Sequence, residues 1–163
     1  MPALQGKTAI VTGASGIVGH GIAEVLAREG CRLMLTCRTN TDGLADIVRR
    51  CEKLAPEVIT RRVDLTKMAD IEDIARTARE RWGHVDILVN NAGITDKYPV
   101  MDIREEEFDR LVATNWKSLF FCSQRIARMM IERQRGKIIN ISSLSSRGAT
   151  EGFAVYSGTK AAI

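Results

Sequence analysis

The chain has 163 residues, of which 45% are hydrophobic and 27% are charged. This length fits one domain at the usual size of about 150 residues, and the hydrophobic content is enough for one core, which argues against a disordered protein. Lys and Arg number 24 against 20 Asp and Glu, so the net charge is only +4. Aromatic residues make up 5% and are not interleaved with a basic tract, which argues against nucleic acid as a partner.

The sequence shows no membrane span, signal peptide or metal-binding motif. No apolar run approaches the roughly 18 residues that cross a bilayer, and residues 1–13 lack the charged and apolar zones of a signal peptide. The four cysteines form no C-x-x-C pair, and the two histidines, His20 and His84, lie in no ligand motif. We therefore expect a cytoplasmic protein with reduced thiols, no metal ion and no membrane partner.

Short apolar runs alternate with amphipathic stretches along the chain. In the first part, this pattern predicts a strand at 7–12, a glycine-rich turn, a helix at 18–29 that stops at Gly30, and a strand at 32–37. A helix capped by Thr41 or Asp42 follows and ends before Pro56. The rest of the pattern predicts strands at 58–63, 86–89 and 137–141, a helix at 68–82 and one long helix within 105–134.

Strands at such even intervals, with helical stretches between them, indicate right-handed crossovers and a parallel sheet covered on both faces. No linker, repeat or low-complexity segment divides the chain, so we expect a single domain over residues 1–163. The predicted fold class is α/β, a Rossmann-type doubly wound parallel sheet. In this architecture ligands lie at the carboxyl ends of the strands.

The segment from Thr12 to Gly19 joins the first strand to the first helix. Glycines there let backbone amides approach a pyrophosphate, and the helix N-terminus adds partial positive charge. The residues expected to form this nucleotide cradle are Gly13, Ser15, Gly16, Ile17 and Gly19. Spacing alone leaves a second interpretation open, in which the turn is only a tight connection.

Arg38 comes directly after the second strand, where a group that reads the ribose is expected, and the preceding residue is Cys37 rather than an acid. An Asp there would accept from the ribose hydroxyls and repel a 2′-phosphate, whereas the Arg fork suits that phosphate. The pattern therefore favours NADP(H) as the cofactor, with NAD(H) as the other possibility. The alternative for Arg38 is a solvated surface side chain.

Polar residues also follow the third and fourth predicted strands. Asp64 and Leu65, followed by a threonine, come after the third strand, and Asn91, Ala92 and Gly93 come after the fourth. Taken together these residues fit an adenine contact and a wall of the cofactor crevice. Taken singly, they fit equally well a helix cap and a simple chain reversal.

Tyr156 and Lys160 lie four residues apart, which places both side chains on one face of a helix. A tyrosine with a pKa near 10 is a poor base at neutral pH, but a nearby cation favours the phenolate. Ser143 lies thirteen residues before Tyr156, just past the last predicted strand, where it can hydrogen-bond a substrate oxygen. An ordinary helix surface and a polar loop are the alternatives for these residues.

The ordered set of motifs resembles the short-chain dehydrogenases/reductases, in their single-domain NAD(P)-dependent branch, over Lys7 to Ile163. The resemblance covers the nucleotide turn and the Asp64 site, and then Asn90-Asn91-Ala92-Gly93, Thr114-Asn115, Ser142-Ser143 and Tyr156-Ser157-Gly158-Thr159-Lys160. Within the family the chain looks closest to 3-oxoacyl-carrier-protein reductases and to gluconate or polyol dehydrogenases.

This resemblance implies an oxidoreductase that moves hydride between a nicotinamide and a small carbonyl or secondary alcohol substrate. Tyr156 is then the acid/base and Ser143 polarises the carbonyl. Lys160 lowers the pKa of Tyr156 and, with Tyr156, holds the cofactor. Asn115 helps to hold a water in a proton relay. The family also implies a homo-oligomer, a dimer or a tetramer.

Two departures from the family pattern bear on these expectations. Ile17 stands where the family's turn carries its second glycine, with a glycine one place earlier at Gly16, so the Ile17 side chain either crowds the pyrophosphate or is turned aside. Family members also continue well past the lysine. The fold is therefore expected to stop after the start of a helix from about Gly152, because the chain is either a fragment of a longer protein or a truncated product. In the truncated case we expect very low activity. A non-catalytic dinucleotide-binding or scaffold protein is the alternative function.

Overall fold

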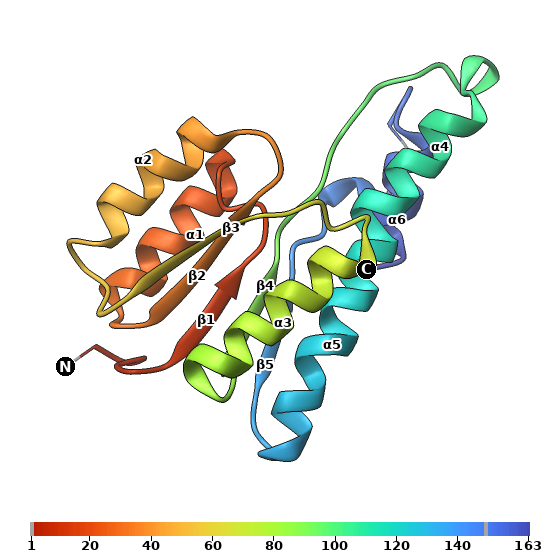
Figure 1. Cartoon of the computed structure of the whole chain (residues 1–163). Helices are drawn as coiled ribbons and strands as arrows, with labels where there is room; N and C mark the ends of the chain where they lie inside the picture. The colour runs from red at the N-terminus through yellow and green to blue at the C-terminus, as the bar shows by residue number, and fades with distance from the viewer. Residues whose placement is uncertain (1, 149) are drawn as a thin grey trace.

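The computed structural model describes residues 2–148 and 150–163, which form a five-stranded parallel sheet with helices on both faces (Figure 1). The strands are β1 (Thr8–Val11), β2 (Arg32–Cys37), β3 (Val58–Arg62), β4 (Ile87–Asn90) and β5 (Lys137–Asn140). The helices are α1 (Ile17–Arg28), α2 (Thr41–Cys51), α3 (Met68–Trp82), α4 (Glu105–Val112), α5 (Ser118–Glu132) and α6 (Ala154–Ala161). The predicted doubly wound α/β class is confirmed.

The side chains of the central strands alternate between two hydrophobic layers. On one face, α1 and α2 cover a layer to which the strands contribute Ala9, Val11, Leu33, Leu35, Ile87 and Val89. On the other face, α3 and α5 cover a layer to which the strands contribute Ile10, Met34 and Leu88. Because both faces are buried, these strands appear in the sequence as continuous apolar runs rather than as alternating ones.

The order of the strands, β3-β2-β1-β4-β5, reverses direction at β1. The chain runs outward from β1 to β2 and β3, and then crosses back to place β4 on the other side of β1. The loops that leave β1 and β4 therefore diverge to opposite faces of the sheet. A doubly wound sheet has its crevice at this point, beyond the carboxyl ends of the strands.

The long helix expected within 105–134 is not continuous. A π-helical turn, Ala113–Lys117, separates α4 from α5. This segment contains no Gly or Pro, so no local signal marks the interruption. The cause is tertiary, because the buried side chain of Asn115 in this turn binds the backbone of Ile94. In the part of the chain that is described, no helix is long and apolar enough to cross a bilayer.

Two helix starts differ from the prediction. The N-cap of α2 is Asn40, whose side chain accepts a hydrogen bond from the Gly43 N–H at 2.9 Å, and not Thr41 or Asp42. The helix that carries Tyr156 starts at Ala154, because Gly152 has a φ of +81°, which belongs to the left-handed region. With eight residues, α6 has about two turns.

Glu57, just before β3, joins α3 to the edge of the sheet. Its Oε2 accepts hydrogen bonds from Trp82 Nε1 and Arg32 Nε, both at 2.9 Å, and Arg81 pairs with its Oε1. Burial by itself raises the pKa of Glu57, but the hydrogen bonds from Trp82, Arg81 and Arg32 outweigh it and lower the pKa from 4.5 to about 2. The carboxylate therefore stabilises the folded state.

Replacing Glu57 with Gln is expected to lower the free energy of unfolding at pH 7 by about 1 to 3 kcal/mol, because charge-assisted hydrogen bonds are lost. The pKa in the folded state lies below the ordinary value, so this contribution is complete above pH 4.5 and declines as the pH falls toward 2. Urea unfolding of wild type and Glu57→Gln at pH 7 and pH 3 measures this contribution to the free energy of unfolding.

The control for this prediction is Glu80→Gln on the exposed surface of α3, which is expected to cost less than about 0.5 kcal/mol. A difference between wild type and Glu57→Gln that has the same size at both pH values would contradict the assignment of the network to a charged Glu57.

Candidate active site

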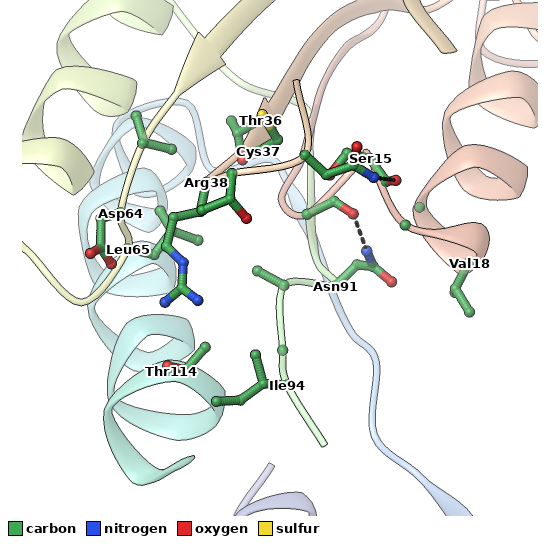
Figure 2. Close-up of a pocket in the computed structure, with 18 of the residues that line it drawn as sticks. Ser15, Val18, Thr36, Cys37, Arg38, Asp64, Leu65, Asn91, Ile94 and Thr114 are labelled. Atoms are coloured by element: carbon green, nitrogen blue, oxygen red, sulfur yellow. Dashed lines mark hydrogen bonds between the residues drawn. The ribbon is translucent and has the colours of Figure 1, made fainter. Parts of the chain in front are cut away.

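A cavity of about 480 Å³ lies at the carboxyl ends of the strands. Most of the residues predicted to bind a cofactor line it, namely Gly13, Ser15, Gly16, Ile17, Gly19, Arg38, Asp64, Leu65, Asn91, Ala92 and Gly93. These residues come from four separate loops, which the fold brings to one edge of the sheet (Figure 2). The volume is typical of a pocket for a small organic ligand.

The glycine turn between β1 and α1 is packed too closely for side chains at two positions. Gly13 has a φ of +63°, and a Cβ there would lie 2.8 Å from Ala92 Cα. A Cβ on Gly19 would lie 2.4 Å from the Gly13 carbonyl oxygen. Gly16, by contrast, has space for a Cβ and an extended backbone. Gly13 and Gly19 are therefore sterically required, whereas Gly16 is not.

Ile17, the departure from the family's glycine pattern, is the first residue of α1. Its side chain is 94% exposed at the rim of the cavity. The helix N-terminus beneath it has no side-chain cap and no acidic residue in its first turn. The first backbone N–H groups of α1 are thus left for another partner, as in helix termini that bind phosphate.

Asn91 and Thr12 fasten the glycine turn to the end of β4. Asn91 Nδ2 donates to the carbonyl oxygens of Thr12 and Gly13, each at 3.0 Å. In return, Thr12 Oγ1 accepts from the backbone N–H groups of Asn91 and Ala92, also at 3.0 Å. Figure 2 shows the Asn91 side chain reaching back to this turn. The Asn91 side chain therefore shapes the wall of the cavity that its backbone lines.

Arg38 extends into the cavity from the end of β2, toward the side where Thr114 and Ile94 lie (Figure 2). Cys37, which precedes it, is buried, and burial raises the pKa of its thiol, so this residue offers no negative charge to the cavity. The only strong charge that the end of β2 presents here is the Arg38 guanidinium.

Asp64 forms a local turn at the far side of the cavity. Its Oδ1 accepts from the Thr66 backbone N–H at 3.1 Å and from Thr66 Oγ1 at 2.8 Å. Burial raises the pKa of the Asp64 carboxyl, but these hydrogen bonds and the nearby Arg38 charge outweigh it and lower the pKa. The Asp64 backbone N–H is taken by Asp70 at 2.6 Å. The turn predicted as an alternative is thus present alongside the cavity lining.

Asn115 joins three segments at the edge of the cavity and is fully buried. Its Oδ1 accepts from the Ile94 N–H at 2.8 Å, and its Nδ2 donates to the Ile94 carbonyl at 2.9 Å and to Thr159 Oγ1 at 3.1 Å. Thr159 Oγ1 donates in turn to the Tyr156 carbonyl at 2.7 Å. This chain of hydrogen bonds connects the cavity wall to the helix that carries Tyr156 and Lys160.

Ser143, Tyr156 and Lys160 are not among the residues that line the cavity. Lys160 is 7% exposed, and its Nζ donates to the Ile141 carbonyl at 2.8 Å. Burial lowers the pKa of Lys160. The Lys160 Nζ would be 3.6 Å from a Cβ on Gly93, so the ammonium lies next to the cavity wall.

The other two side chains have their own contacts. Tyr156 packs edge to face against Phe153, with ring centroids 5.9 Å apart. Ser143 Oγ accepts from the Ser145 N–H at 3.2 Å, at the start of a short 3₁₀ turn, Leu144–Ser146. Ser142, its neighbour, instead donates to the Lys160 carbonyl at 2.6 Å.

The family profile for short chain dehydrogenases matches residues 7–163. The chain belongs to the short-chain dehydrogenase family. It is 37% identical to a sorbitol dehydrogenase from Cereibacter sphaeroides over 98% of this chain and 61% of that protein. It is 38% identical to a gluconate 5-dehydrogenase from Gluconobacter oxydans, over 98% of this chain and 62% of that protein.

A solved structure and a related reductase agree with this family membership. A short-chain alcohol dehydrogenase from Sinorhizobium meliloti superimposes with a TM-score of 0.92 at 36% identity, over 98% of this chain and 63% of that one. A 3-oxoacyl-[acyl-carrier-protein] reductase from Staphylococcus epidermidis is 32% identical over 96% of this chain and 64% of its own length. The chain thus spans about three fifths of the length of these short-chain dehydrogenases.

Among the residues that line the cavity but were not predicted from the sequence are Asn40 and Ile94. Ile94 directly follows the Asn90-Asn91-Ala92-Gly93 motif, so the end of that motif was the available signal. Asn40 had a separate signal, because Asn is among the residues preferred at helix N-caps and it stands immediately before α2.

The variant Asn115→Leu is expected to lower the free energy of unfolding by about 2 to 5 kcal/mol, because the N–H and C=O of Ile94 lose their partner. Urea unfolding measures the loss of stability, and amide hydrogen exchange at Ile94 measures the loss of protection. Lys117→Ala, in the same π-helical turn but exposed, is the control and is expected to change neither. Unchanged protection of Ile94 in Asn115→Leu would show that the Asn115 hydrogen bonds do not hold the loop at Ile94.

Proposed function

We propose that the chain is the nucleotide-binding part of an NADP(H)-dependent oxidoreductase that interconverts a carbonyl and a secondary alcohol. The observation that carries the proposal is that the glycine turn and Arg38 line one cavity, and that the buried Lys160 ammonium lies next to the wall of this cavity at Gly93. The named activities of the relatives, which are dehydrogenases and reductases, support the reaction class.

The residues around the cavity fit a dinucleotide. Gly13 and Gly19 allow an approach that a Cβ would block, and the uncapped N-terminus of α1 offers backbone N–H groups to a pyrophosphate. We assign the adenine end to the side of the cavity lined by Asp64 and Leu65, and the nicotinamide end to Gly93, near Lys160. When bound, the nicotinamide would supply or accept the hydride.

The choice of NADP(H) rests on the end of β2. Arg38 enters the cavity, and Cys37 stands where an acid would bind the ribose hydroxyls of NAD(H). A guanidinium pairs with a phosphate through two parallel hydrogen bonds, and no carboxylate from this strand end opposes it. We therefore assign Arg38 to the 2′-phosphate.

We assign the proton chemistry to α6. Tyr156 would protonate or deprotonate the substrate oxygen, and Lys160, one helical turn away, would stabilise the phenolate with its positive charge. Ser143 would hydrogen-bond the same oxygen and polarise the carbonyl. Asn115 would act through Thr159 to hold Tyr156 in place, and we propose that it also helps to hold a water in the proton relay.

The substrate class follows from the relatives' names, which are those of enzymes acting on a polyol, a sugar acid and an acyl-carrier ketone. We therefore propose a small-molecule carbonyl or alcohol as the substrate.

We also propose a homo-oligomer that associates through the α4–α5 surface, where Phe108, Trp116 and Phe120 are exposed.

A second candidate function is dinucleotide binding without turnover. It is favoured by the placement of Ser143, Tyr156 and Lys160 outside the cavity lining. Titration with NADPH, together with loss of NADPH absorbance in the presence of a panel of carbonyl compounds, separates the two functions. Binding without consumption by a full-length protein favours the second function.

The variant Tyr156→Phe is expected to lower turnover by at least about a hundredfold, because the phenol that transfers the proton is removed. The dissociation constant for NADPH is expected to stay within about twofold of wild type. NADPH absorbance measures turnover, and NADPH fluorescence measures binding. Turnover retained by Tyr156→Phe would rule out its role as the acid/base.

The variant Arg38→Ala is expected to weaken NADP(H) binding about tenfold to a hundredfold, since each charge-assisted hydrogen bond contributes about 1.5 to 3 kcal/mol. Binding of NAD(H) is expected to change less than about twofold. Arg38→Lys keeps the charge without the planar fork, so its affinity for NADP(H) should fall between those of wild type and Arg38→Ala. Equal losses for both cofactors in a fluorescence titration would end the assignment of Arg38 to the 2′-phosphate.

A further inference from the structure

The loop after β2 is tied directly to the glycine turn. Asn40 Nδ2 donates to the Ser15 carbonyl at 3.0 Å, and Asn40 Oδ1 accepts from the Gly43 N–H at 2.9 Å. Both ends of this side-chain amide are therefore used, one toward the turn after β1 and one toward the first turn of α2. Asn40 and Ser15 also line the cavity.

Gly43 shows how closely the two segments approach. A Cβ at Gly43 would lie 2.5 Å from Asn40 Nδ2 and 2.7 Å from the Ser15 carbonyl oxygen. Its own carbonyl is 2.9 Å from the His20 Nε2 of α1. Glycine is unfavourable within a helix by about 1 kcal/mol, and its presence in the first turn of α2 is explained by this contact.

The Ser15 carbonyl belongs to the peptide that leads into Gly16. Because a trans peptide is planar, fixing the direction of its carbonyl also fixes the direction of the Gly16 N–H. Gly16 lacks a Cβ, so no side chain of its own restrains this peptide. Among the described residues, the only backbone hydrogen bond of the Ser15–Gly16 peptide is a long one of 3.4 Å from the Gly16 N–H to the Gly13 carbonyl.

We propose that Asn40 is a positioning residue for the nucleotide turn. Its amide holds the Ser15–Gly16 peptide in one orientation and so keeps the uncapped N-terminus of α1 ready for a pyrophosphate. The role compensates for the position of Ile17, which removes a glycine from the family's usual place and leaves the flexible one at Gly16. This inference rests on the proposed dinucleotide function.

The test is the variant Asn40→Ser in the 163-residue chain, with Asp42→Ala as the control. Serine retains an oxygen that caps α2 but lacks the amide nitrogen with which Asn40 donates to the Ser15 carbonyl. The dissociation constants for NADP⁺ and NAD⁺ are expected to rise by the same factor, about three- to tenfold, because both carry the pyrophosphate. Binding of adenosine 2′-monophosphate, which has no pyrophosphate, is expected to stay within about twofold.

Asp42→Ala alters an exposed acid in the first turn of α2 and is expected to leave all three affinities unchanged. Asn40→Asp, which has nearly the same shape and is a strong cap, provides a second variant without the donor and is expected to lose at least as much NAD⁺ affinity. Thermal unfolding of each variant, monitored by circular dichroism, establishes that it is folded.

Unchanged NADP⁺ and NAD⁺ affinities in Asn40→Ser would overturn the inference. A loss shared equally by adenosine 2′-monophosphate would also overturn it, because it would mean a general loosening of the cavity. A loss confined to NADP⁺ would place Asn40 at the 2′-phosphate with Arg38 and would contradict a role at the turn. A wild-type chain that binds neither dinucleotide would remove the proposed function together with this inference.

Discussion

Hydrogen bonds between the ends of β1 and β4 hold the candidate site together. The two strands are neighbours in the sheet, but the loops that leave them diverge to opposite faces. Thr12 Oγ1 and the Asn91 side chain join these loops through four bonds of 3.0 Å each. The close packing of Gly13 on Ala92 depends on this attachment. The switch point of the sheet therefore becomes a shaped cavity rather than a loose gap between loops.

Three asparagine side chains perform the same task at different places around the cavity. Asn40 bridges the Ser15 carbonyl and the Gly43 N–H, Asn91 binds two carbonyls of the glycine turn, and Asn115 pairs with both polar groups of Ile94. A side-chain amide carries both donors and an acceptor, so it can satisfy loop backbone groups that no sheet or helix partner reaches. Loops that line a ligand site are thereby held without regular secondary structure.

The helix α6, which carries the residues proposed for the reaction, is held in place by contacts with other segments rather than by its own length. A helix of eight residues is marginal in isolation, so α6 requires tertiary contacts. Thr159, 3% exposed, connects it to Asn115, and Ser142 donates to its Lys160 carbonyl. The buried Lys160 Nζ donates to the Ile141 carbonyl and lies beside the cavity wall at Gly93. The cavity wall at Ile94 is thus joined by hydrogen bonds to the helix that carries Tyr156 and Lys160.

By itself the sequence determined the α/β class, the strands to within a residue or two, and the residues that gather at the carboxyl ends of the strands. Apolar runs and glycine spacing are local signals, and a parallel sheet forces the loops after its strands to one edge. Only the tertiary structure decided the π-helical turn at Asn115, the cap at Asn40 and the buried contact of Lys160. Each depends on a partner more than a dozen residues away or on a choice among adjacent polar residues, and local sequence patterns carry no information about such pairings.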